Sequence, residues 1–235
     1  MGVFRFKGFE VRNEDSAMKV NTDGVLLGAV TDVFPEDRRV LDVGTGTGVV
    51  ALMVSQRLSS LTQEFSVQGL DVDRPSALEA AFNFAGSPWR EHLSAHCCDF
   101  LGWDGGEYDL IVSNPPFFDN SLKAPDCRRC AARHTGLSYR EILQFSETHL
   151  SPGGRVSMIL PFQVEADLLR YGRMCGLVPW KLLRIRTVET KDPSRLIVQF
   201  ARKGALCHAP GELTLTDGKG RRTSQHASLL TDYLL

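Results

Sequence analysis

Three closely spaced glycines follow a short apolar segment and could bind a ligand through the main chain. Gly44, Gly46 and Gly48 come directly after residues 39–43, and Asp42 lies two residues before the first of them. Glycine lets the backbone turn tightly and lets a ligand approach closely. A helix that begins at Gly48 would add unpaired N–H groups at its N-terminus. We therefore predict a ligand-binding loop between this strand and this helix.

The spacing of the glycines separates two kinds of ligand. A dinucleotide site has the spacing G-x-G-x-x-G and binds pyrophosphate at the helix N-terminus. In this chain the spacing is G-x-G-x-G, and the carboxylate of Asp42 would repel a pyrophosphate. The same carboxylate suits a ligand with an ammonium and a sulfonium group, which describes S-adenosylmethionine. We predict S-adenosylmethionine as the cofactor, bound by Asp42 and the glycines.

Further acids follow the next predicted strands. Asp71 ends the predicted strand 65–71, and Asp99 and Phe100 follow the strand after it. A carboxylate at the end of the second strand can accept hydrogen bonds from both ribose hydroxyls. We predict this role for Asp71 rather than Asp73, because Asp71 directly follows the apolar residues. We predict that Asp99 binds the adenine amine of the cofactor and that Phe100 flanks its ring.

The sequence Asn114-Pro115-Pro116-Phe117 follows a strongly apolar predicted strand, 108–113. A residue before proline is held in extended geometry, and proline itself has no N–H to donate. The Asn114 side-chain oxygen and the Pro115 carbonyl would thus form an acceptor pair beside an aromatic ring. Such a pair fits a planar N–H₂ group whose ring lies on Phe117. We predict Asn114, Pro115 and Phe117 as catalytic, with Asn114 also contacting the cofactor and Phe117 the substrate.

Strand and helix signals alternate along the chain, which predicts an α/β fold: a parallel sheet with helices on both faces. The predicted strands are residues 39–43, 65–71, 92–98, 108–113, 155–160, 178–187 and 195–201. The predicted helices are residues 48–58, 75–85, 139–150 and 163–174. Ligands of such Rossmann-like sheets bind at the carboxyl ends of the strands. Each motif above follows a strand, as this rule requires.

The length of 235 residues suits one α/β domain. We expect an N-terminal cap over residues 1–35, a catalytic core over 36–203 and a tail over 204–235. The tail carries a predicted strand at 212–215 and a final short helix. We expect a cytoplasmic protein, because no apolar run approaches a membrane span and the N-terminus lacks a signal peptide's apolar region.

The net charge of −1 does not indicate a nucleic-acid partner, but two segments are locally basic. Residues 121–140 hold five Lys or Arg and one acid, and residues 173–203 hold eight Lys or Arg and two acids. Such clusters can attract a polyanion. They can equally form an ordinary solvated surface, and charge alone does not decide between these interpretations.

These motifs resemble those of the class I S-adenosylmethionine-dependent methyltransferases with an Asn-Pro-Pro-(Phe/Tyr) motif, which methylate planar amine nitrogens. Over nearly its whole length the chain is similar to a bacterial family that methylates N6 of the adenine 3′ of the anticodon, position 37, in tRNA1(Val). The resemblance is carried by residues 17–28, Ser87-Pro88-Trp89, Asn114-Pro115-Pro116-Phe117, Ala132-Arg133-His134-Thr135 and Tyr233-Leu234-Leu235. The first and fourth of these segments are more specific than the glycine loop.

The resemblance implies several features that the residue patterns do not give. It implies a seven-stranded, mostly parallel sheet whose last strand is antiparallel, a valine tRNA as partner and no metal. It places Lys19, Thr22 and Asp23 around the cofactor. We further expect a monomer whose loop arginines contact RNA phosphates. These arginines are Arg128, Arg129 and Arg133.

Several alternatives remain at this point. Cys127, Cys130 and His134 could be three zinc ligands, although no fourth ligand is evident nearby. The Asn-Pro-Pro motif also permits methylation of guanine N2 in ribosomal RNA or of a release-factor glutamine. The glycine spacing argues against a dinucleotide-dependent oxidoreductase. The full set of acids together with Asn114 argues against an inactive RNA-binding module.

Overall fold

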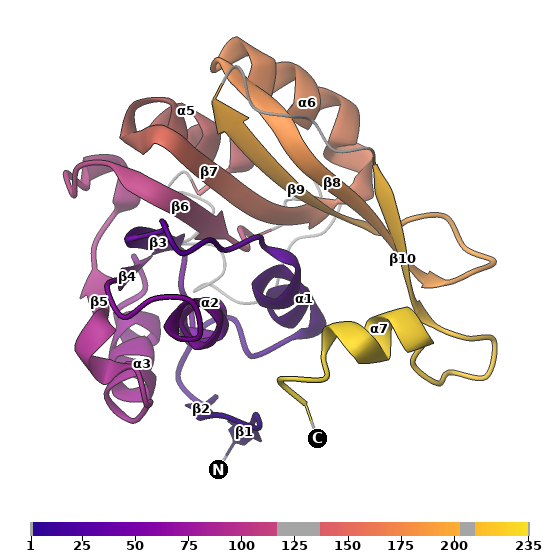
Figure 1. Cartoon of the computed structure of the whole chain (residues 1–235), viewed down its shortest axis with the longest axis horizontal. Coiled ribbons are helices and arrows are strands. Elements are labelled where there is room, and N and C mark those ends of the chain that lie inside the picture. The colour runs from indigo at the N-terminus through magenta and orange to yellow at the C-terminus, as the bar shows by residue number, and fades with distance from the viewer. Residues whose placement is uncertain (1, 117–136, 203–209, 235) are drawn as a thin grey trace.

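An eight-stranded sheet forms the centre of the computed structural model, which describes residues 2–116, 137–202 and 210–234 (Figure 1). Its strand order is β10-β8-β9-β7-β6-β3-β4-β5. The strands are β3 (Arg39–Val43), β4 (Ser66–Asp71), β5 (Leu93–Cys97), β6 (Tyr108–Ser113), β7 (Leu150–Pro161), β8 (Leu177–Val188), β9 (Arg195–Arg202) and β10 (Gly211–Thr216). Neighbouring strands are parallel except at β9, which is antiparallel to β7 and β8.

The predicted α/β class and the antiparallel seventh strand are confirmed. The sheet has one strand more than the seven that the resemblance implied, because β10, the strand predicted in the tail, pairs with β8 at the edge. The tail therefore extends the sheet on the side far from β3.

Helices cover both faces of the sheet (Figure 1). They are α1 (Thr22–Val30), α2 (Val49–Ser59), α3 (Arg74–Ala85), α5 (Tyr139–His149), α6 (Glu165–Met174) and α7 (Ser224–Leu229). Alternate residues of a strand point to opposite faces. In β6, Leu110 and Val112 join the core cluster of α1, α2 and α3, whereas Ile111 joins that of α5 and α6. The central strands are thus apolar throughout because both faces are buried.

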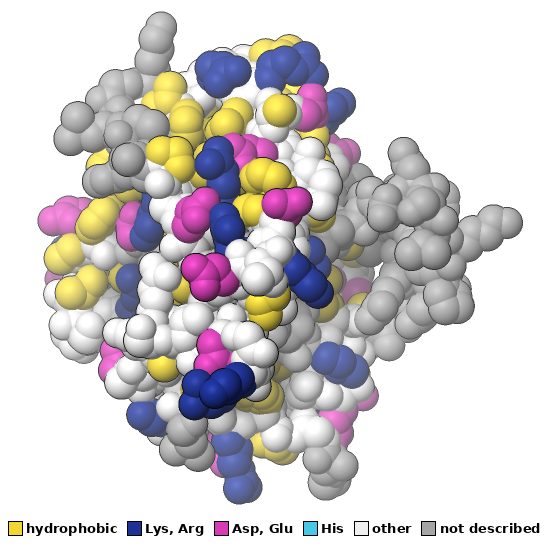
Figure 2. All heavy atoms as spheres, turned by 90° about the vertical axis from the view of Figure 1, so that its right-hand side faces the viewer, with side chains coloured by type: hydrophobic (Ala, Val, Ile, Leu, Met, Phe, Trp, Pro, Cys, Tyr) yellow, Lys and Arg dark blue, Asp and Glu magenta, His cyan; other side chains and the backbone are white. Residues whose placement is uncertain are grey.

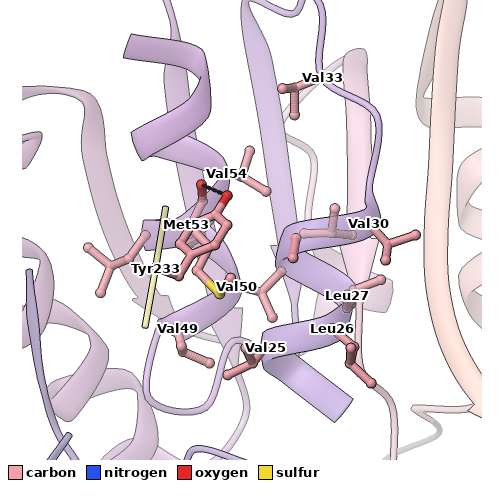
Figure 3. Packing of buried hydrophobic residues seen from close by; sticks show 14 of the residues in the cluster. Val25, Leu26, Leu27, Val30, Val33, Val49, Val50, Met53, Val54 and Tyr233 are labelled. Carbon is pink, nitrogen blue, oxygen red and sulfur yellow. Dashed lines mark hydrogen bonds between the residues drawn. The ribbon is translucent and has the colours of Figure 1, made fainter. Parts of the chain in front are cut away.

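Helices α1 and α2 pack closely beneath the sheet (Figure 3). A Cβ added at Gly28 would lie only 2.8 Å from the Cβ of Met53, so glycine permits this approach. The C-terminal Tyr233 packs against the same helix, and its hydroxyl donates to the Met53 carbonyl over 3.5 Å. Helix α1 and the C-terminal end of the chain therefore share one apolar core with α2, the helix that follows the glycine loop.

The N-terminal residues form a hairpin, β1 (Val3–Arg5) with β2 (Glu10–Arg12). Phe6 and Phe9 stack with ring centroids 4.4 Å apart and join the core cluster of α2. The residues predicted as a cap, 1–35, thus comprise this hairpin, a connecting segment and α1. None of the helices in the described ranges is long and apolar enough to cross a membrane.

Strand β7 differs from its predicted extent. Pro152-Gly153-Gly154 predicted a break before a strand at 155–160, whereas β7 begins at Leu150, directly after α5. The pairing of β6 with β7 shifts register at this point. A Cβ at Gly154 would lie 2.7 Å from the Tyr108 carbonyl oxygen, so glycine allows the irregular strand to stay close to β6. The Pro-Gly-Gly sequence marks a bulge and not a break.

Candidate active site

The carboxyl ends of β3, β4, β5 and β6 lie side by side and bring the predicted motifs to one edge of the sheet. Gly44 follows β3, Asp71 ends β4, Asp99 follows β5 and Asn114 follows β6. Short 3₁₀ turns occupy Arg90–His92 before β5, Phe100–Gly102 after it and Phe162–Val164 after β7. The edge expected to bind ligands therefore carries all four sequence motifs.

The glycine loop needs glycine at each of its three positions. Gly44, Gly46 and Gly48 have φ angles of 72°, 55° and 82°, in the left-handed region that other residues avoid. A Cβ at Gly44 would lie 2.7 Å from Cδ2 of Leu137, and one at Gly48 would lie 2.4 Å from the Phe84 ring. The loop is thus a tight, glycine-lined turn between β3 and α2.

Asp42 is buried and forms hydrogen bonds with both the glycine loop and α2. Its Oδ2 accepts hydrogen bonds from the Thr45 hydroxyl over 2.8 Å and from the Ala51 N–H over 3.2 Å. Burial raises the pKa of Asp42 to about 7, and the nearby Asp71 adds to the rise, while the two hydrogen bonds act against it. The structure therefore shows Asp42 joining the loop to α2, and its contact with the cofactor stays a prediction.

Asp71 contacts the main chain of the glycine loop. Its carboxylate accepts hydrogen bonds from the N–H groups of Gly46 and Asp73, each over 2.9 Å. Asp73, the alternative acid, caps α3 by accepting from the Ser76 N–H over 3.1 Å and from its hydroxyl over 2.6 Å. Asp71 is thus the acid of this pair that adjoins the glycines.

Asp99 and Phe100 lie in different environments. Asp99 is exposed, and its Oδ1 accepts a hydrogen bond from the Leu101 N–H over 3.0 Å. Phe100 is buried and packs edge-on against the Phe145 ring of α5, with centroids 5.6 Å apart. Phe100 is therefore part of the core beneath the edge, and its predicted contact with the adenine of the cofactor stays untested.

Asn114 lies where β6 meets the glycine loop. The preceding residue, Ser113, donates its hydroxyl hydrogen to the Val43 carbonyl over 2.7 Å and so ties β6 to β3. The Asn114 Nδ2 lies 3.6 Å from the sulfur of Met18. Its Oδ1 is buried and has no hydrogen-bond partner within the described ranges. Such an acceptor costs about 1–3 kcal/mol if it stays unpaired, which points to a donor that arrives with a ligand.

The other predicted catalytic residues are placed only in part. Pro115 is buried directly after Asn114, and Pro116 is half-buried. Phe117 lies outside the described residues, as do the predicted RNA contacts Arg128, Arg129 and Arg133. The same holds for the possible zinc ligands Cys127, Cys130 and His134. Among the residues that the structure describes, no group of three potential metal ligands occurs.

The residues that the resemblance places around the cofactor lie near α1. Lys19 is exposed and its ammonium donates to the Glu14 carbonyl. Thr22 is the exposed first residue of α1. Asp23 is paired with Arg195 at 2.9 Å, and Arg195 begins β9 at the same edge of the sheet. The ion pair therefore joins the start of α1 to the start of β9 at this edge of the sheet.

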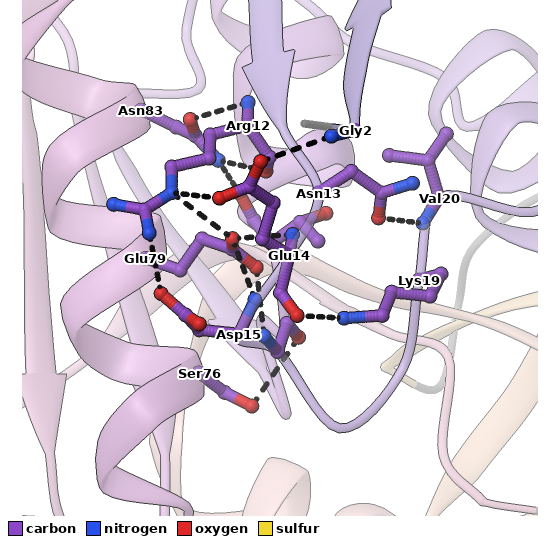
Figure 4. Close-up of polar contacts among 12 residues, drawn as sticks. Gly2, Arg12, Asn13, Glu14, Asp15, Lys19, Val20, Ser76, Glu79 and Asn83 are labelled. Carbon is purple, nitrogen blue, oxygen red and sulfur yellow. Dashed lines mark hydrogen bonds and ion pairs between the residues drawn. The ribbon is translucent and has the colours of Figure 1, made fainter.

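A segment whose anchor on α3 was not predicted from the sequence reaches the site from the N-terminal side of α1. Residues 14–18, which we call the strap, are held by α3 (Figure 4). The carboxylate of Glu79 accepts the N–H groups of Glu14, Asp15 and Ser16 over 2.6, 2.9 and 2.7 Å. The Glu79 side chain is fully buried. The strap thus ends with Met18 beside Asn114.

A signal for this anchor exists in the sequence. Ser76, Glu79 and Asn83 recur at helical spacing and form one polar stripe within the predicted helix. Ser76 accepts the Ala17 N–H over 3.0 Å, and Asn83 bonds both N–H and C=O of Arg12. The stripe predicts a polar face on this helix. It does not predict that this face bonds to main-chain groups of the preceding segment rather than to water.

Known proteins match both the sequence and the fold. Residues 21–167 match the family described as methyltransferase small domain. The tRNA1(Val) (adenine(37)-N6)-methyltransferase of Bacteroides fragilis is 42% identical over 202 residues, which cover 84% of this chain and 83% of that protein. The protein of the same name from Pedobacter heparinus is 39% identical over 236 residues, covering 99% and 97%.

Solved structures agree in fold. A predicted O-methyltransferase from Agrobacterium tumefaciens matches with a TM-score of 0.65 at 16% identity and covers 90% of this chain and 96% of its own. TrmN from Thermus thermophilus matches with a TM-score of 0.53 at 22% identity, covering 76% of this chain and 48% of its own. The edge motifs, the family match and the sequence relatives together lead to one conclusion. The chain belongs to the methyltransferase small domain family and, within it, to the family of the tRNA1(Val) (adenine(37)-N6)-methyltransferases.

Proposed function

We propose that this protein transfers a methyl group from S-adenosylmethionine to N6 of adenine 37 in tRNA1(Val). The observation that carries the proposal is the buried, unpartnered Oδ1 of Asn114, directly before two prolines and beside the glycine loop. An N–H₂ group can supply the donor that this acceptor lacks. The names of the sequence relatives supply the identity of the amine and of the RNA.

The described residues fit the cofactor. Three glycines in left-handed conformations leave room for a ligand to approach the main chain after β3. Asp71 adjoins this loop, because its carboxylate accepts a hydrogen bond from the Gly46 N–H over 2.9 Å. We propose that Asp71 binds the ribose, that Asp99 binds the adenine amine and that the glycines contact the methionine part. Bound there, S-adenosylmethionine supplies an electrophilic methyl group on a cationic sulfur.

The protein's own contribution is to hold and orient the amine. Asn114 Oδ1 and the Pro115 carbonyl accept the two amine hydrogens and thereby aim the nitrogen lone pair away from the protein acceptors. No strong base is needed at Asn114, since the product loses its extra proton only after transfer. Holding the amine in line provides most of the rate. Phe117 is proposed to stack on the adenine ring.

The remaining expectations follow from this proposal. We propose that Lys19, Thr22 and Asp23 lie at the cofactor's side of the site and that Arg128, Arg129 and Arg133 contact RNA phosphates. We also propose a single domain over residues 1–235 that acts as a monomer in the cytoplasm, where bacterial tRNA is modified. The alternatives, guanine N2 and a release-factor glutamine, are not favoured by the relatives.

A direct assay tests the proposed function. Purified protein is incubated with labelled S-adenosylmethionine and an unmodified tRNA1(Val) transcript, and the RNA is digested to nucleosides. We expect N6-methyladenosine in this transcript and none in a matched transcript that carries guanosine at position 37. Methylation of both transcripts would place the target elsewhere in the RNA. Methylation of neither would contradict the proposed substrate.

A further inference from the structure

The carboxamide of Asn114 has two ends, and among the described residues only one of them has a hydrogen-bond partner. Nδ2 lies 3.6 Å from the sulfur of Met18, whereas Oδ1 is buried without a hydrogen-bond partner. A thioether sulfur is a weak acceptor and has no hydrogen to donate. It therefore favours the amide orientation in which the N–H₂ end faces Met18 and the oxygen faces away.

We infer that Met18 is a positioning residue that fixes the orientation of the Asn114 amide for an amine substrate. This inference rests on the proposed function. In the reversed orientation the amide oxygen would face the sulfur, acceptor against acceptor. The amide N–H₂ group would then meet the N–H₂ group of the substrate, donor against donor. Met18 thus selects the end of the amide that the adenine encounters.

The strap places the Met18 sulfur by main-chain contacts. The Met18 carbonyl accepts the Ser16 hydroxyl over 3.0 Å, and the Ser16 N–H donates to Glu79 over 2.7 Å. The same carbonyl lies 3.6 Å from where a Cβ at Gly46 would stand. Methionine is a flexible side chain, and the fixed backbone limits the positions that its sulfur can reach. One segment therefore contacts both the cofactor loop and the catalytic amide.

Two substitutions separate the acceptor from the packing. Met18→Leu keeps much of the apolar volume but removes the acceptor. Met18→Gln keeps the length of the side chain and offers a carbonyl oxygen, a stronger acceptor than sulfur. Met174→Leu is the matched control, because Met174 is 67% exposed at the end of α6. A role in packing alone would make the leucine variant the milder of the two substitutions at position 18.

The kinetic test measures kcat and KM for tRNA, with cofactor binding measured separately. We expect Met18→Leu to lower kcat about 10-fold, as for one lost orienting hydrogen bond. KM and cofactor affinity should stay within about 2-fold, and Met18→Gln should recover most of the lost kcat. Unchanged kcat in Met18→Leu would overturn the inference. Equal losses in the leucine and glutamine variants would overturn it too, because they would indicate packing.

A spectroscopic test does not depend on the substrate. The side-chain amide resonances of Asn114 are identified by their absence in Asn114→Ala. We expect them to shift in Met18→Leu and to stay in place in Met174→Leu. Unshifted resonances in Met18→Leu would refute the contact, even if the wild-type protein did not methylate tRNA. An inactive wild type with shifted resonances would contradict the proposed function and leave the positioning contact supported.

Discussion

At the scale of single residues, the sequence offers two acids that could bind the ribose of the cofactor. Asp71 and Asp73 are two positions apart in the sequence, and residue type alone does not separate them. In the structure the Asp73 carboxylate is the N-cap of α3, whereas that of Asp71 contacts Gly46 in the glycine loop. The geometry supports the choice of Asp71, and a pair of substitutions tests it.

Asp71→Ala should weaken cofactor binding by about 10-fold to 100-fold, the range for losing hydrogen bonds to a charged group. Asp73→Ala is the matched control, and it should cost about 1 kcal/mol of stability through the lost helix cap. Its cofactor affinity should stay near that of the wild type. Titration calorimetry with S-adenosylmethionine measures both affinities. Equal losses in the two variants would show that the ribose acceptor was wrongly assigned.

Asp42 and Phe100 show what residue type and spacing leave open. Their positions, Asp42 near the end of β3 and Phe100 after β5, were predictable from the strand signals in the sequence. The directions of their side chains were not. Asp42 turns inward to Thr45 and Ala51, and Phe100 packs against Phe145, a residue 45 positions along the chain. Such directions depend on tertiary packing, which no local pattern specifies.

At the scale of elements, α3 supports the site from a distance. Its Glu79 accepts three main-chain N–H groups of the strap, and the strap lies against Gly46 and Asn114. A buried carboxylate is stable only with such charge-assisted hydrogen bonds. The helix was predicted from the sequence, but the strap was not, because an irregular segment has no period to recognise.

Glu79→Gln should lower the free energy of unfolding by about 2–3 kcal/mol, because an amide N–H₂ end would face one of the strap's N–H groups. Chemical denaturation measures the change. Glu91→Gln is the control, since the Glu91 side chain is 83% exposed, and it should change stability by less than about 0.5 kcal/mol. A Glu79 variant as stable as this control would mean that the strap is held by other contacts.

At the scale of the whole molecule, charge counted along the sequence overstates the basic surface. Four of the eight basic residues in 173–203 pair with acids from outside that segment. They are Lys181 with Asp32, Arg184 with Glu165, Arg186 with Glu212 and Arg195 with Asp23. Figure 2 shows Lys and Arg interspersed with Asp and Glu on the face at the right of Figure 1. In the other basic segment, 121–140, the described Arg140 likewise pairs with an acid from outside, Asp167, so the RNA contacts predicted for Arg128, Arg129 and Arg133 stay a prediction.

Binding to tRNA should weaken at least about 10-fold between roughly 50 and 200 mM salt, since phosphate contacts release counterions. The double variant Arg128→Ala/Arg129→Ala should flatten this dependence. Arg90→Ala should not flatten it, because Arg90 is exposed and precedes β5, away from the carboxyl ends of the strands that carry the motifs. Filter binding over a salt series measures the slopes. A flat wild-type response would remove the case for phosphate contacts.

The acceptor at Asn114 is the central claim, and single-turnover methyl transfer by Asn114→Ala tests it most directly. We expect the rate of transfer to adenine 37 to fall by about 100-fold or more, as for a removed polar group that orients the reacting atoms. Affinity for S-adenosylmethionine should stay within about 3-fold of the wild type, because the glycine loop and Asp71 are intact. A transfer rate near that of the wild type would contradict the account.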